Sequence, residues 1–132
     1  MTPQDFEHLV AEEFPGAVPE KFRNKIKNVA FLVEREPSLE VREQEGLEDG
    51  ETLLGYYRGV PHTARGEGYG VGGAMPDTIT LYQGPIEEEA AELGGGEETL
   101  RKVIRETIWH EVAHHFGMDE HEVRERERGR DA

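Results

Sequence analysis

The sequence predicts an α+β domain, and three observations support this. Apolar residues recur at helical spacing over residues 6–14 and 99–116. Short β-branched and aromatic runs occupy residues 28–34, 52–58 and 77–82. The length of 132 residues suits one domain with a real hydrophobic core. We therefore expect a single domain, residues 1–132, that combines helices with strands.

Two helices are expected at the start of the chain. The first should begin after Thr2, which can cap it, and end at Pro15-Gly16. The second should begin near Pro19. The residues expected to be buried in these helices are Phe6, Leu9, Val10, Phe14, Phe22 and Ile26.

Three strands should follow. Residues 28–34 contain no breaker, which predicts a largely buried strand that ends before Pro37. Residues 52–58 and 77–82 also have β character, and we expect them to pair as a hairpin. The acidic stretch 38–51 between the first two strands is expected to be a solvated connection with one helical turn.

The glycine-rich residues 59–76 contain a match to G-x-G-x-x-G at residues 68–73. A nucleotide-binding loop of this type leads into a helix, whereas this one leads into a predicted strand. We therefore reject nucleotide binding. Two alternatives remain, a loop that borders a functional site and a plain flexible hairpin loop.

A short helix is expected over residues 86–93, and the glycines at 94–96 should separate it from a long helix. This long helix should begin with Glu97 and Glu98, which suit its first turn, and reach residue 116, with Gly117 as its cap. Its second half should be buried nearly all round, because Ile108, Trp109, Val112, Ala113 and Phe116 are spread around the helix. A last, exposed helix is expected over residues 120–130, where Glu and Arg alternate.

The long helix contains the sequence H-E-x-x-H at residues 110–114. Residues four apart lie one turn above each other, so His110 and His114 can bind a single ion. Glu111 lies about 100° round the helix from His110, beside these two ligands. A zinc ion held there could activate a water molecule, and the Glu111 carboxylate could accept its proton.

Chance is the alternative explanation of the motif. A chain with this many glutamates and histidines would contain H-E-x-x-H about once in twenty cases, and the histidines would then be solvated or hydrogen-bonded groups. The amphipathic setting favours metal binding, because a buried glutamate beside histidines is costly without an ion.

Charge and composition exclude several classes of partner. The net charge of −14 argues against nucleic acid and against an anionic membrane surface. The sequence has no signal-like or membrane-spanning run, so we expect a cytoplasmic protein. The lack of cysteine excludes disulfides, thiolate zinc ligands and cysteine nucleophiles.

Residues 53–123 resemble a small bacterial zincin-like metallopeptidase family. The matching blocks occur in order and read LLGYYRGVP (residues 53–61), PDTITLY (residues 76–82) and HEVAHHFGMD (residues 110–119). The resemblance implies a minimal zincin-like fold, in which a small mixed sheet packs on the H-E-x-x-H helix between flanking helices. It also implies an edge strand able to hold an extended peptide, a zinc ion on His110 and His114, and Glu111 as the general base.

The third metal ligand is predicted by register. In related proteases the residue ten positions after the first histidine binds the metal, and this residue is Glu120. Asp119 and His121 flank it and remain alternatives. His115 should point away from the ion. His8, His62 and the tyrosines are expected to be structural or surface groups; Tyr56, Tyr57 and Tyr69 are weaker candidates for stabilising an oxyanion.

We therefore predict a zinc-dependent peptidase acting on a peptide or protein substrate. The alternative is a non-catalytic zinc-binding domain whose acidic surface binds a protein partner. Glu111 favours the enzyme, because purely structural zinc does not need a general base.

Overall fold

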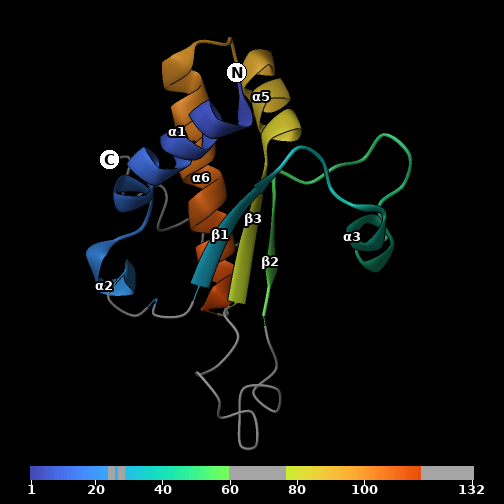
Figure 1. Ribbon diagram of the computed structural model, residues 1–132, viewed down its shortest axis with the longest axis horizontal. Coiled ribbons are helices and arrows are strands. Elements are labelled where there is room, and N and C mark those ends of the chain that lie inside the picture. The colour runs from blue at the N-terminus through green and yellow to red at the C-terminus, as the bar shows by residue number, and fades with distance from the viewer. Residues whose placement is uncertain (24–25, 27–28, 60–76, 117–132) are drawn as a thin grey trace, which may run out of the picture.

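The computed structural model describes residues 1–23, 26, 29–59 and 77–116 (Figure 1). These residues form a mixture of helices and strands, which confirms the predicted α+β class. In chain order the elements are α1 (Pro3–Ala17), α2 (Glu20–Arg23), β1 (Val29–Glu34), α3 (Leu39–Gln44), β2 (Gly55–Arg58), β3 (Asp77–Tyr82), α5 (Gln83–Glu92) and α6 (Glu97–His115).

The described strands form one mixed sheet in the order β1-β3-β2. β3 is central: it pairs in parallel with β1, where Phe31 is opposite Ile79, and antiparallel with β2, where Tyr57 is opposite Ile79. The expected antiparallel pairing of the second and third strands is therefore confirmed. The sheet also matches the small mixed sheet that the family resemblance implied.

β1 is less buried than its sequence predicted. Leu32 is 45% exposed and Glu34 is also exposed, whereas the other residues of β1 are half-buried. The cause is the position of β1 at the edge of the described sheet, where a strand has only one neighbour. An apolar run indicates a strand but does not distinguish an edge position from a central one.

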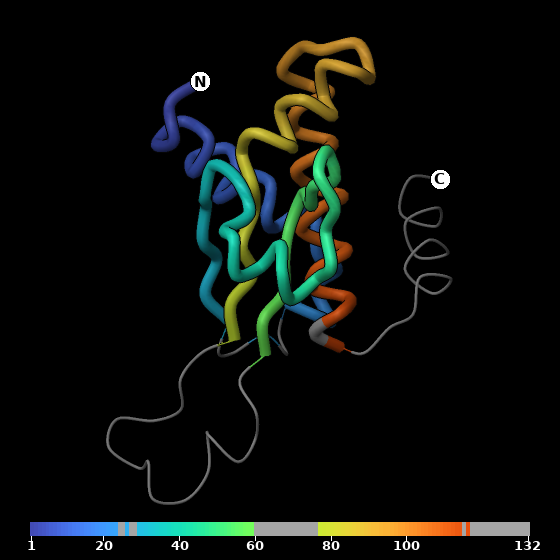
Figure 2. Tube along the Cα trace, turned by 90° about the vertical axis from the view of Figure 1, so that its right-hand side faces the viewer, coloured from blue at the N-terminus to red at the C-terminus, as the bar shows by residue number. Residues whose placement is uncertain are grey.

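Helices α1 and α6 pack on each other against one face of the sheet, and α3 lies beyond β2 (Figures 1 and 2). The hydrophobic core is formed by residues from α1, α2, β3, α5 and α6: Phe6, Leu9, Val10, Ala17, Val18, Phe22, Ile79, Leu81, Ile86, Ala90, Leu100, Val103, Ile104, Ile108, Trp109, Val112 and Ala113. Because α6 contributes the most residues to this core, its position is firmly set.

The aromatic ring of Phe22 packs against two aromatic rings in the second half of α6. Its centroid lies 5.5 Å from that of Trp109 and 5.1 Å from that of Phe116. Both partners lie on the side of α6 away from the histidines of the motif. The predicted burial of this half of the helix is confirmed for Ile108, Trp109, Val112 and Ala113, whereas Phe116 is only half-buried.

α1 extends further than predicted. Thr2 caps it as expected, since the Thr2 hydroxyl accepts a 3.0 Å hydrogen bond from the Asp5 N–H. The predicted end at Pro15-Gly16 is wrong, because α1 continues to Ala17. Ala17 and Val18 are completely buried in the core, and this burial outweighs the hydrogen bond that the proline cannot donate.

Two other features determine how the helices are arranged. The glycines between α5 and α6 separate the two helices as predicted, and Gly94, Gly95 and Gly96 all have positive φ angles. Glu13 of α1 binds two guanidinium groups of α6: its distances are 2.8 Å to Arg101 and 2.6 Å to Arg105. These ion pairs join α1 to the first half of α6.

Several predictions fall outside the described residues. They are the loop at residues 60–76, the cap at Gly117 and the helix at residues 120–130. Among the helices that the structure does describe, none is both long and apolar enough to span a membrane.

Candidate active site

The site is built on one stripe of α6. At about 100° per residue, Val103, Glu106, Thr107, His110 and His114 lie within roughly 100° of one another around the helix, and Glu111 borders this stripe. The stripe faces β2 and the C-terminal part of α5, which contact α6 from that side. The helix thus presents both histidines of the motif and its glutamate to one region.

Glu111 is the buried member of this group. The residue is 8% exposed, and its Oε1 atom lies 3.6 Å from Nδ1 of His114. Its carboxylate also accepts a hydrogen bond from the backbone N–H of Tyr57 in β2. Glu111 is therefore positioned by two contacts, one with His114 in α6 and one with the backbone of β2.

The histidines are more accessible than the glutamate. His114 has a side chain that is 45% exposed, and His110 is half-buried. Nδ1 of His110 lies 3.3 Å from the Glu106 carbonyl oxygen, one turn earlier in α6. Two imidazoles one turn apart, beside a buried carboxylate, form a donor set that suits zinc.

Burial raises the pKa of Glu111 above its usual range, because the charged form loses solvation. The imidazoles of His114 and His110 and the Tyr57 N–H act in the opposite direction, but burial outweighs them. A carboxylate with a raised pKa is better matched to accepting and returning a proton near neutral pH.

Gly55 allows β2 to approach the site helix closely. A Cβ atom at this position would lie 2.9 Å from Cγ2 of Thr107 and 3.1 Å from Cγ of Glu111. Both distances are shorter than normal carbon–carbon contacts. Any side chain here would push β2 away from α6, so the close approach depends on glycine.

Two cavities meet at Glu111. The first, of about 330 Å³, lies between α5, α6 and the start of β2; it is lined by Leu53, Leu54, Gly55, Glu89, Leu93, Val103, Glu106, Thr107, His110 and Glu111. The second, of about 230 Å³, is lined by Glu45, Leu53, Gly55, Tyr56, Tyr57, Glu111 and His114. Each histidine of the motif therefore lines one cavity, and Glu111 lines both.

The structure brings together part of the predicted site. His110, Glu111 and His114 lie side by side on α6, whereas Glu120, Asp119 and His121 are outside the described residues. The side chain of His115 is also outside them. Within the described part of the chain, no group of three or more His, Cys, Asp or Glu residues is arranged to hold a metal ion.

Two tyrosines near the site have other partners. The Tyr57 hydroxyl donates a 2.7 Å hydrogen bond to Asp77, and the Tyr56 hydroxyl donates a 3.2 Å bond to Gln44. These bonds agree with the structural role expected for both tyrosines. Tyr69 lies outside the described residues.

Sequence reasoning missed three contributors: the Tyr57 backbone, Gly55 and the glutamates of the larger cavity. A glycine within a predicted strand is a signal of close backbone approach, and it could have identified Gly55. The residues of the larger cavity come from three separate parts of the chain, so only the fold reveals them.

Comparisons with known proteins identify a family and a similar solved structure. The family model described as "Zincin-like metallopeptidase" matches residues 26–130, which includes the whole sheet and α6. A solved structure of a conserved hypothetical protein from Thermus thermophilus is similar, with 25% sequence identity and a TM-score of 0.52. The likeness covers 88% of this chain and 94% of that chain. No protein of curated function matches the sequence.

Proposed function

Because the chain belongs to the zincin-like metallopeptidase family, we propose that it hydrolyses peptide bonds in a zinc-dependent reaction. One observation carries the proposal. A buried glutamate, Glu111, lies beside two histidines on α6, and its carboxylate accepts a hydrogen bond from the backbone N–H of Tyr57 in β2. A site that only bound zinc would not require this carboxylate.

His110 and His114 are the proposed zinc ligands. The third proposed ligand is Glu120, with Asp119 and His121 as alternatives by sequence position. Zinc at this place supplies Lewis acidity, which polarises a peptide carbonyl and lowers the pKa of a water molecule.

Glu111 acts as the general base in this proposal. Its carboxylate accepts a proton from the attacking water and returns it to the leaving amine. The backbone N–H of Tyr57 holds the carboxylate in a fixed position while it does so. Positioning of this kind matters because a base must lie within hydrogen-bond reach of the proton that it removes.

β2 is the proposed binding strand for an extended peptide. Tyr82 N–H donates to the Leu54 carbonyl, so by antiparallel alternation Tyr56 also pairs toward β3. Gly55 and Tyr57 then direct their backbone groups away from β3, toward the side where Glu111 lies. An extended substrate that adds to this edge would pass beside the candidate base.

Metal content is the first experiment. Mass spectrometry on the purified, untagged protein should give about one zinc per chain, and His110→Ala/His114→Ala should lose it. Zinc-loaded protein should then cleave members of a peptide library. Absence of zinc after reconstitution would refute the metal site, whereas zinc binding without cleavage of any peptide would favour the non-catalytic alternative.

A further inference from the structure

We propose that the 330 Å³ cavity beside His110, hereafter the α5–α6 cavity, receives a lysine or arginine side chain of the substrate. This residue would flank the peptide bond that is cleaved. The inference rests on the proposed peptidase function, because it assigns the substrate class of the same site.

The location of the α5–α6 cavity supports a role in substrate binding. His110 and Glu111 form one end of it, and Gly55 of the proposed peptide-binding strand borders the same end. A peptide lying along β2 would therefore place one of its side chains at the mouth of the cavity.

The walls suit a long hydrocarbon chain. Leu53 and Leu54 approach from the segment before β2, Leu93 from the end of α5, and Val103 from α6. Leu93 is 60% exposed, so much of its apolar surface faces water. An apolar stem in the cavity would cover this side chain.

The charges in the cavity select a cation. Its described lining includes three glutamates, Glu89, Glu106 and Glu111, and no lysine or arginine. Among described residues, the only cation paired with Glu106 is Lys102, at 3.9 Å, and this pair is largely exposed. Such a pair is weak enough for a substrate cation to compete with it.

The spacing of the carboxylates also suits a long basic side chain. Glu106 lies one turn before His110 in α6, about 6 Å along the helix axis. Glu89 and Leu93 are one turn apart on α5 and line the same cavity. A side chain that enters near His110 could place its charge beside Glu106, about one turn away, as the four-carbon stem of lysine allows.

The pocket assignment can be tested by binding without turnover. Isotope-labelled, zinc-loaded Glu111→Gln protein is titrated by NMR with two matched hexapeptides, Ala-Ala-Ala-Lys-Ala-Ala and its norleucine analogue. The lysine peptide should bind about tenfold more tightly, with shifts in the amide signals of Leu53 and Leu93. Adding Glu89→Gln/Glu106→Gln should remove this preference.

A matched control carries the same change in charge elsewhere. Glu88→Gln/Glu98→Gln replaces two exposed glutamates of α5 and α6 that do not line the cavity, and it should keep the tenfold preference. Equal binding of the two peptides would overturn the pocket assignment. A preference that survives Glu89→Gln/Glu106→Gln would also overturn it.

Turnover by the protein with Glu111 intact separates this inference from the proposed function. Cleavage next to residues other than Lys and Arg, with equal binding of the two peptides, would keep the peptidase and reject the pocket. A lysine preference in binding, with no cleavage of any peptide, would keep the pocket and reject the peptidase.

Discussion

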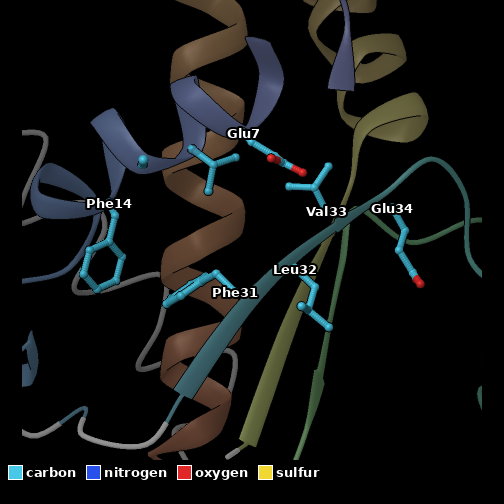
Figure 3. A pocket seen from close by; sticks show the side chains of 8 residues that line it. Glu7, Phe14, Phe31, Leu32, Val33 and Glu34 are labelled. Carbon is cyan, nitrogen blue, oxygen red and sulfur yellow. The ribbon is translucent and has the colours of Figure 1, made fainter. Parts of the chain in front are cut away.

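The two edges of the sheet carry cavities that differ in size and in chemistry. The β1 groove, a cavity of about 660 Å³ between α1 and β1, is lined by Glu7, Val10, Ala11, Phe14, Phe31, Leu32, Val33 and Glu34 (Figure 3). The cavities beside β2 are about half that size or less, yet they share Glu111 and contain both histidines of the motif.

The difference shows that cavity size alone does not locate a reactive site. In the β1 groove, the Phe14 and Phe31 rings pack edge to face with centroids 5.0 Å apart, and its two glutamates are exposed. Beside β2, Glu111 is buried and lies next to the imidazoles of His110 and His114. Desolvated, converging polar groups are the feature that distinguishes candidate sites from apolar hollows.

The largest effect is expected when one glutamate is replaced in each of the two regions. Glu111→Gln should lower kcat/KM for peptide cleavage by about 10²- to 10⁴-fold, because the amide cannot accept the proton from water. Zinc content should stay near one per chain. Glu7→Gln, which makes the same change in the β1 groove, should leave both quantities unaltered. Equal activity of Glu111→Gln and the unmodified protein would remove Glu111 from the role of base.

A pair of glycine substitutions tests the close approach of β2 to α6. Gly55→Ala should lower the free energy of unfolding by about 1–3 kcal/mol, since its methyl group would overlap Thr107 and Glu111. Gly16→Ala in α1 is the control, because no atom lies within 4 Å of its added Cβ. Denaturant unfolding of both variants measures the difference. A Gly55→Ala protein as stable as Gly16→Ala would show that β2 does not depend on this contact.

The smallest expected effect concerns the ion pairs of Glu13, on the helix that forms the β1 groove. Burial raises the pKa of Glu13, but Arg105 and Arg101 lower it more, so the net pKa is below its ordinary value of 4.5. The charged form therefore stabilises the fold above pH 4.5, and this contribution is lost as the pH falls through the lowered pKa. Glu13→Gln should cost about 1 kcal/mol at neutral pH and progressively less below the ordinary pKa of the carboxyl.

Urea unfolding at several pH values measures this dependence, with peptide cleavage as a second readout. The cleavage rate at neutral pH should be the same in Glu13→Gln and the unmodified protein. A stability difference that stays constant from neutral to acid pH would show that the Glu13 charge contributes nothing.

Local patterns predicted most of the elements but not how they assemble. The limits of α6 and β3 follow from apolar spacing and from the glycines before α6, all of which act within a few residues. The parallel pairing of β1 with β3 joins residues far apart in sequence, and no local signal encodes it. The extension of α1 past Pro15 could not be predicted for the same reason, because it depends on burial of Ala17 in the assembled core.

The candidate site likewise has one part that local sequence predicts and one part that it does not. The neighbouring positions of His110, Glu111 and His114 follow from the geometry of a single helix. The α5–α6 cavity could not be predicted, because its walls come from residues 53–55, 89–93 and 103–111. The roles of the three motif residues and of Glu120 stay predictions until metal content and cleavage are measured.

The hydrogen bond from Tyr57 to Glu111 has a consequence for how this site can evolve. Its donor is a main-chain N–H, which every amino acid except proline supplies. Random mutation can therefore alter the side chain at position 57 without removing the bond that orients Glu111. A restraint of this kind tolerates sequence drift, and aligned side chains alone would not reveal it.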